Sequence, residues 1–224
     1  MTYDKRMLKE NIERITAEIN GRATLLAATK TVPPKIINFA ADCGIRVIGE
    51  NRVNELLDKY DRIDRERIDI HFIGHLQTNK VKYIIDKVSL IHSLDSIKLA
   101  EEIDRRAYRA DKLMDVLIEV NLANEVTKSG IPFEEIDIFV DKIRHFDNIR
   151  LCGLMAIPPK CENSQENSLF FNKISKKFID IFHKKVDNSN IGILSIGMSD
   201  DYMAAVESGS TLVRIGSAIF GNRN

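Results

Sequence analysis

Three stretches of the chain carry residues whose types and spacing could do chemistry together. The first is "LLAATK", an apolar run that ends on Lys30. The others are "SIGMSDD", which contains Ser199, and "VRIGSA", which contains Arg214, Gly216 and Ser217. Lysine is almost never fully buried without a partner. Lys30 therefore either ends a strand in solvent or is an amine that the fold holds in place for a reason.

The small and hydroxyl residues of the last two stretches are typical of an anion site. Ser199, Gly216 and Ser217 each lie close to the start of a helical pattern. Backbone N–H groups at such positions are unsatisfied and favour negative charge. Barrels of alternating strands and helices often bind phosphate after strands seven and eight. The pattern indicates a phosphate site, and the alternative is that these residues form ordinary helix caps and turns.

Lys30 and Arg214 extend this interpretation. A lysine beside a bound phosphate in a half-apolar cavity can form an imine with an aldehyde, because desolvation lowers the amine pKa. The alternative for Lys30 is a surface strand end. Arg214 lies near the end of the last strand pattern, and an inward guanidinium needs an acceptor. That acceptor could be a carboxylate of Glu50 or Asp200, or an aromatic nitrogen of a ligand.

Short apolar runs alternate with helical patterns along the chain, which predicts parallel strands joined by crossover helices. An opening helix is expected over 4–20. The expected strands cover 24–28, 47–49, 70–74, 90–92, 115–120, 149–155, 192–196 and 212–215. The expected helices between them cover 34–43, 51–60, 79–87, 96–110, 132–145, 165–185 and 200–208. Eight such units predict a single (β/α)8 TIM-type barrel spanning residues 1–224, with an extra N-terminal helix. A doubly wound open sheet is the alternative.

Composition excludes several classes of protein. The chain has 33 lysine and arginine residues and 33 aspartate and glutamate residues. It therefore has no excess of basic charge that would favour nucleic acid as a partner. The three scattered cysteines, Cys43, Cys152 and Cys161, suit reduced thiols. No signal peptide and no membrane-spanning apolar run is visible. His71 and His75 have no carboxylate at a matching spacing, so we expect no metal site. We expect a soluble, cytoplasmic protein.

Several longer motifs together resemble the pyridoxal phosphate homeostasis protein family, whose barrel is alanine racemase N-terminal-domain-like. They are "AATK", "IGENRVNE", "HFIGHLQTNK", "IEVNLANEVTKSG", "GLMAIPP" and "LSIGMSDDYMAAVESGSTLVRIGSAIFG", in the order of the family and over nearly the whole chain. The family is also described as proline-synthetase-co-transcribed. "GENRVNE" departs from the commoner "GENYVQE", and Ser217 stands where threonine is usual.

The resemblance implies a cofactor, pyridoxal 5′-phosphate (PLP), and a role for each matching residue. Lys30 matches the lysine that forms a Schiff base with PLP, and Arg214 matches the arginine facing the pyridine nitrogen. Ser199, Gly216 and Ser217 match phosphate-binding positions. Asn51 and Met155 match residues that line the cofactor.

The implied function is to hold PLP reversibly on Lys30 and to act in intracellular PLP homeostasis and delivery, with little or no turnover. We expect a monomer whose partners are PLP and PLP-dependent apoenzymes. One alternative is an amino-acid racemase. Racemases with this barrel take a second acid/base from an appended β-domain, which we do not expect here. Another alternative is a binding module for a different phosphorylated metabolite.

Overall fold

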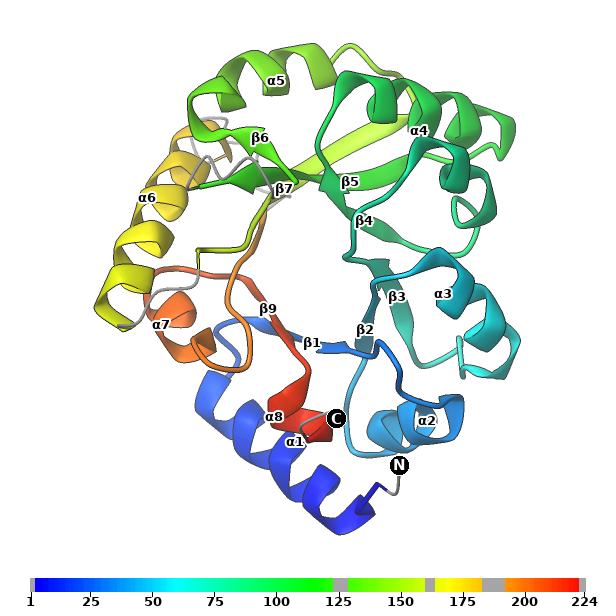
Figure 1. Cartoon of the computed structure of the whole chain (residues 1–224), viewed down its shortest axis with the longest axis vertical. Helices are drawn as coiled ribbons and strands as arrows, with labels where there is room; N and C mark the ends of the chain where they lie inside the picture. The colour runs from blue at the N-terminus through cyan, green and yellow to red at the C-terminus, as the bar shows by residue number, and fades with distance from the viewer. Residues whose placement is uncertain (1–2, 123–128, 160–163, 183–191, 222–224) are drawn as a thin grey trace.

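The structure is a computed structural model that describes residues 3–122, 129–159, 164–182 and 192–221. Its centre is a closed barrel of eight parallel strands surrounded by helices (Figure 1). The barrel strands are β1 (Thr24–Ala28), β2 (Val47–Glu50), β3 (Asp69–Phe72), β4 (Leu90–Leu94), β5 (Met114–Asn121), β7 (Ile149–Ala156), β8 (Ile193–Ser195) and β9 (Leu212–Ile215). The expected (β/α)8 barrel is confirmed, and the open-sheet alternative is wrong.

Two pairings close the barrel. β9 pairs with β1, from Thr24 beside Leu212 to Ala27 beside Ile215. β4 pairs with β5, with a register shift between Ile91 and Leu94. A ninth strand, β6 (Ile131–Pro132), was not expected from the sequence. It pairs only with the end of β5, outside the closed ring.

The helices follow the expected order with some changes at their ends. They are α1 (Lys5–Ile19), α2 (Pro34–Asp42), α3 (Val53–Lys59), α4 (Ile97–Arg109), α5 (Ile136–Ile143), α6 (Ser164–Phe182), α7 (Tyr202–Glu207) and α8 (Ser217–Phe220). The α-helix expected over 79–87 is instead a 3-10 helix, η2 (Thr78–Tyr83). Two further 3-10 turns are η1 (Tyr60–Arg62) and η3 (Phe133–Glu135), and η3 replaces the start of the helix expected over 132–145. Residues 183–185 of the helix expected over 165–185 lie outside the described residues.

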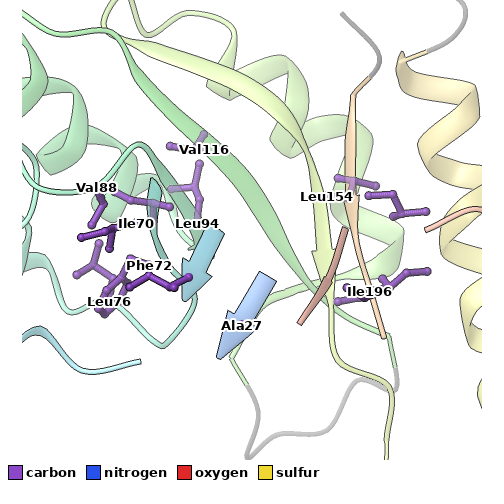
Figure 2. Close-up of a cluster of buried hydrophobic side chains, with 14 of the residues drawn as sticks. Ala27, Ile70, Phe72, Leu76, Val88, Leu94, Val116, Leu154 and Ile196 are labelled. Atoms are coloured by element: carbon purple, nitrogen blue, oxygen red, sulfur yellow. The ribbon is translucent and has the colours of Figure 1, made fainter. Parts of the chain in front are cut away.

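The apolar core lies mainly between the strands and the helices around them (Figure 2). Phe72 of β3, Val116 of β5 and Leu154 of β7 are fully buried there. Burial of such side chains stabilises the fold by roughly 1.5–3 kcal/mol each. The barrel interior is different, because apolar residues share it with the polar side chains described below.

The opening helix is confirmed and contacts α2, α7 and α8. Asp4 caps it by accepting hydrogen bonds from the N–H groups of Arg6 and Met7. Asn11 Nδ2 donates to the carbonyl oxygen of Ile219, 3.2 Å away in α8. The first helix is thereby tied to the last one.

Cys43 and Cys152 are free thiols, and Cys161 lies outside the described residues. Among the helices in the described ranges, none has both the length and the apolar character needed to cross a bilayer.

Gly74, just after β3, is required by the close approach of another loop. A Cβ at this position would lie 2.1 Å from the carbonyl oxygen of Asn51, a backbone atom that cannot move alone. We expect Gly74→Ala to lower the free energy of unfolding by about 1–3 kcal/mol, as overpacking does. Urea denaturation followed by circular dichroism measures the change.

Gly21→Asn is the matched control. Gly21 has φ +71° and no atom within 4 Å of an added Cβ, and asparagine tolerates this conformation. An equal loss in both variants would show that crowding at Asn51 is not the cause.

Candidate functional site

The residues that the sequence singled out gather at the carboxyl ends of the strands. Lys30 follows β1, Asn51 follows β2, Met155 lies near the end of β7, and Arg214 lies near the end of β9. Because Ala27 pairs with Ile215, the turn that carries Lys30 lies beside the loop that begins at Gly216. This is the face where barrels of this kind carry their sites.

Ser199 lies against the start of α8, which contains Ser217 and follows Gly216. Ser199 Oγ accepts hydrogen bonds from the backbone N–H groups of Gly216 and Ala218, each at 3.2 Å. These two N–H groups lie at the start of α8, and both point at the same oxygen atom. The arrangement has the donor pattern that an anionic oxygen would use. The left-handed turn at Gly197, with φ +92°, leads the chain from β8 to Ser199.

Arg214 is buried, and its partners are neutral. Nη1 donates to the carbonyl oxygen and to Oγ of Ser195, both at 2.7 Å, and Nη2 donates to the carbonyl oxygen of Ala156 at 3.1 Å. Of the two acceptors that the sequence left open, a carboxylate of Glu50 or Asp200 is therefore not the one that these hydrogen bonds use. Burial lowers the pKa of Arg214 to about 10, while nearby Glu119 and Asp201 act in the opposite direction.

A chain of hydrogen bonds continues from Arg214 through the barrel interior. Ser195 Oγ lies 3.1 Å from His92 Nδ1, and His92 Nε2 lies 3.0 Å from His71 Nδ1. Since Ser195 Oγ accepts from Arg214, we assign its proton to the contact with His92 Nδ1. His92 then carries its own proton on Nε2, toward His71. Burial first, and then the electrostatic influence of His71 and Arg214, lowers the pKa of His92 well below its usual range, which keeps its ring neutral.

Glu119 is a site residue that the sequence did not reveal. It lies on β5, is 9% exposed, and its Oε2 atom has no hydrogen-bond partner in the described part of the chain. Burial, and to a smaller extent Asp95, raises its pKa to about 7, while Arg214 acts in the opposite direction. A buried carboxyl with an unused oxygen near Arg214 is suited to contact a polar ligand in the barrel.

The other predicted residues are placed as follows. Met155 is buried in the barrel interior against Leu90 and Leu117. Asn51 lines a rim pocket of about 560 Å3 together with Glu55, His75, Gln77 and Lys80. That pocket does not include Lys30, Ser199 or Arg214, so it adjoins the predicted site rather than containing it.

Lys30 itself is solvent-exposed, which matches the alternative of a strand end in solvent and not that of a desolvated amine. Instead, the turn around it is held from the side of α3. Lys59 Nζ donates to the carbonyl oxygen of Thr29 at 2.9 Å, and Thr31 N–H donates to the carboxylate of Glu55. Sequence reasoning missed both partners. Val53, Leu56 and Lys59 form the buried positions of α3, and a lysine on such a face was the available signal.

The part of the chain that the structure describes contains no group of three or more His, Cys, Asp or Glu residues that could hold a metal ion.

Comparisons with known proteins agree with this architecture. The alanine racemase N-terminal domain family matches residues 3–224. Diaminopimelate decarboxylase from M. jannaschii has the same fold, with a TM-score of 0.78 at 13% identity; the match covers 97% of this chain and 60% of that one. The fold and the rim site therefore define a barrel of the alanine racemase N-terminal-domain class.

Relatives of higher sequence identity indicate which family within this class the chain belongs to. A pyridoxal phosphate homeostasis protein from Aquifex aeolicus is 45% identical over 96% of both chains. Another from Escherichia coli K12 is 37% identical over 90% of this chain and 86% of its own. The structure of PipY from Synechococcus elongatus, with PLP bound, has a TM-score of 0.85 at 26% identity and covers 96% of this chain and 100% of that one. The chain belongs to the pyridoxal phosphate homeostasis protein family.

The raised pKa of Glu119 gives a pH-dependent stability. Its pKa rises from 4.5 in the unfolded chain to about 7 in the folded one, so the folded state binds the proton more tightly. The stability that this group provides is present below pH 4.5 and is lost as the pH rises through about 7. Relative to the wild type, we expect Glu119→Gln to gain up to roughly 3 kcal/mol between pH 4 and pH 8.

Urea unfolding of both proteins at these two pH values measures the gain. A difference between variant and wild type that is the same at both pH values would contradict the assignment to Glu119.

Proposed function

We propose that the chain binds PLP reversibly through a Schiff base on Lys30 and serves in the homeostasis and delivery of PLP, with little or no catalytic turnover. The observation that carries this proposal is the pair of loops with Ser199 and with Gly216 and Ser217, where backbone N–H groups converge on the Ser199 oxygen. The pairing of β1 with β9 brings these loops beside the turn that carries Lys30. The names of the relatives and the PLP in PipY support it.

The residues present fit such a ligand. The phosphate would take the N–H donors that Ser199 Oγ now receives from Gly216 and Ala218, and Ser199 would add its hydroxyl. Arg214 would contact the pyridine nitrogen, with Asn51 and Met155 beside the ring. The unpartnered Oε2 of Glu119 marks a further polar position within the same barrel.

The site favours binding over turnover. PLP acts as an electron sink when its ring nitrogen is protonated, which requires an acidic partner. Arg214 can only donate to that nitrogen, because guanidinium has no acceptor atom. Hydrogen bonds to Ser195 and Ala156 hold the Arg214 guanidinium in place, so it is this group, and not a carboxylate, that would face the ring nitrogen. Arg214 thus orients the ligand and gives its ring nitrogen a hydrogen bond without acting as an acidic partner.

The partners follow from this role. We propose that apoenzymes that require PLP receive it from this protein, and that the protein acts in the cytoplasm as a monomer with one domain over residues 1–224. Its balanced charge supports the absence of a nucleic-acid partner.

The central test is Lys30→Ala. We expect the wild-type protein mixed with PLP to develop a visible imine absorption band, and the variant to develop none, because the amine that forms the Schiff base has been removed. Borohydride reduction followed by peptide mapping should place the adduct on Lys30.

Lys35→Ala, an exposed lysine on α2, is the matched control and should retain the band. An adduct on another lysine in the wild type would overturn the proposal. Sustained racemisation of alanine that is lost in Lys30→Ala would instead favour the racemase alternative.

Ser199→Ala tests the phosphate position. Removing the hydroxyl should weaken PLP binding about tenfold, the effect of one lost hydrogen bond to a charged group. Titrations with pyridoxal, which has no phosphate, should give the same weak affinity in variant and wild type. Equal weakening for both ligands would show that Ser199 does not contact the phosphate.

A further inference from the structure

The ammonium group of Lys59 donates all its hydrogen bonds to groups of the protein, next to the turn that carries Lys30. Its Nζ atom lies 2.9 Å from the carbonyl oxygen of Thr29, 3.0 Å from Glu50 Oε1 and 2.6 Å from Glu55 Oε1. An ammonium has three donors, so these contacts account for all of them. Lys59 is 6% exposed and Glu50 is fully buried.

The contacts hold both peptide groups that adjoin Lys30. The Thr29 carbonyl belongs to the peptide bond before Lys30, and Lys59 donates to it. The Thr31 N–H belongs to the peptide bond after Lys30, and it donates to Glu55. The Thr29 hydroxyl adds a third connection, because Oγ1 lies 2.6 Å from Glu50 Oε1. The backbone on each side of Lys30 is therefore fixed by α3 and β2.

The turn has a conformation that needs support. Thr31 has φ +61°, in the left-handed region that β-branched residues rarely adopt. Such a residue costs of order 1–3 kcal/mol, and the conformation persists only where its surroundings hold it. Glu55 and the bond from Val32 N–H to the Thr29 carbonyl, at 2.9 Å, provide that support.

A contribution to stability alone does not account for the charged group of Glu50, Glu55 and Lys59. A buried ion pair is weak evidence for stability, because desolvation offsets the attraction between the charges. Here desolvation raises the pKa of Glu50 even though Lys59 acts to lower it. Glu50 Oε2 also lacks a partner among the described residues. Orientation of the turn is the role that the geometry supports.

We propose that Glu55 and Lys59 are positioning residues for Lys30: they clamp the Thr29–Thr31 turn so that the Lys30 amine meets the aldehyde of a bound ligand. Neither residue needs to touch that ligand. This inference rests on the proposed function, since it concerns the same amine.

The experiment separates covalent from non-covalent binding. Wild type, Glu55→Ala and Lys59→Met are each mixed with PLP, to follow imine formation, and with pyridoxine 5′-phosphate, which has no aldehyde. We expect the rate of imine formation to fall at least about tenfold in both variants, with the affinity for pyridoxine 5′-phosphate held within about twofold, because misplacing a reacting group affects the reaction more than binding. Glu55 is the primary variant, because its side chain is partly exposed and its removal leaves the Lys59–Glu50 pair in place.

Three further variants sharpen the result. Glu55→Gln retains an oxygen for the Thr31 N–H and should retain most of the rate. Thr31→Gly, added to Glu55→Ala, should recover part of the rate, because glycine adopts positive φ without strain. Asp61→Asn removes an exposed carboxylate from the turn after α3 and should change nothing.

Two results would overturn the inference: an unchanged rate of imine formation in Glu55→Ala, or an equal loss of PLP and pyridoxine 5′-phosphate binding. Hydrogen exchange at the Thr31 amide without ligand provides a separate check, and it should be faster in Glu55→Ala than in the wild type. A wild-type protein that forms no imine on Lys30 would overturn the proposed function, and this inference with it. That failure is visible in the wild type alone.

Discussion

The parallel pairing of β1 with β9 is the constraint on which the rest of the structure depends. It closes the barrel and joins the part of the chain that carries Lys30 to the part that carries Arg214, Gly216 and Ser217. These segments are far apart in sequence, and no local interaction could bring them together. A shift of this pairing by one residue would turn Arg214 out of the barrel, because successive side chains of a strand point to opposite faces.

The barrel interior combines two environments. Apolar residues such as Leu26, Leu90 and Leu117 occupy part of it. The hydrogen-bonded series from Arg214 through Ser195 and His92 to His71 occupies another part. Because each member has a partner, the polar groups are buried without the cost of unsatisfied donors. The same bonds fix the direction of the guanidinium, so the interior provides orientation as well as stability.

The sequence predicted the barrel, the order of its elements and the meeting of Ser199 with Gly216 and Ser217. These features depend on periodicity and on small residues after strands, which local sequence records. It did not predict Glu119 or the roles of Glu55 and Lys59. A glutamate in an apolar strand and an i, i+4 pair on a helix look the same whether they face solvent or another element. For Glu55 and Lys59, the contact of α3 with β2 and the hydrogen bonds from α3 to Thr29 and Thr31 distinguish the two cases.

The setting of Lys30 was left open by the sequence, for a related reason. An apolar strand followed by a lysine fits either a desolvated amine or a strand end in solvent. The strand ends at Ala28, as expected, the chain turns at Thr31, and Lys30 is exposed. Lys59 is buried instead, and the signal for this was its place on the apolar face of α3 with Val53 and Leu56. The shortened helices have a similar origin: residues 78–83 form a 3-10 helix against α4 although their pattern suits an α-helix.

The helix that precedes the barrel has a consequence for how firmly the protein retains what it binds. Asn11 of α1 holds α8 through the Ile219 carbonyl, and Glu18 and Arg14 hold Tyr202 at the start of α7. The two loops that form the anion site run directly into α7 and α8. Fraying of α1 would therefore loosen both loops before the barrel itself begins to unfold, and under the proposed function it would release the ligand at that stage.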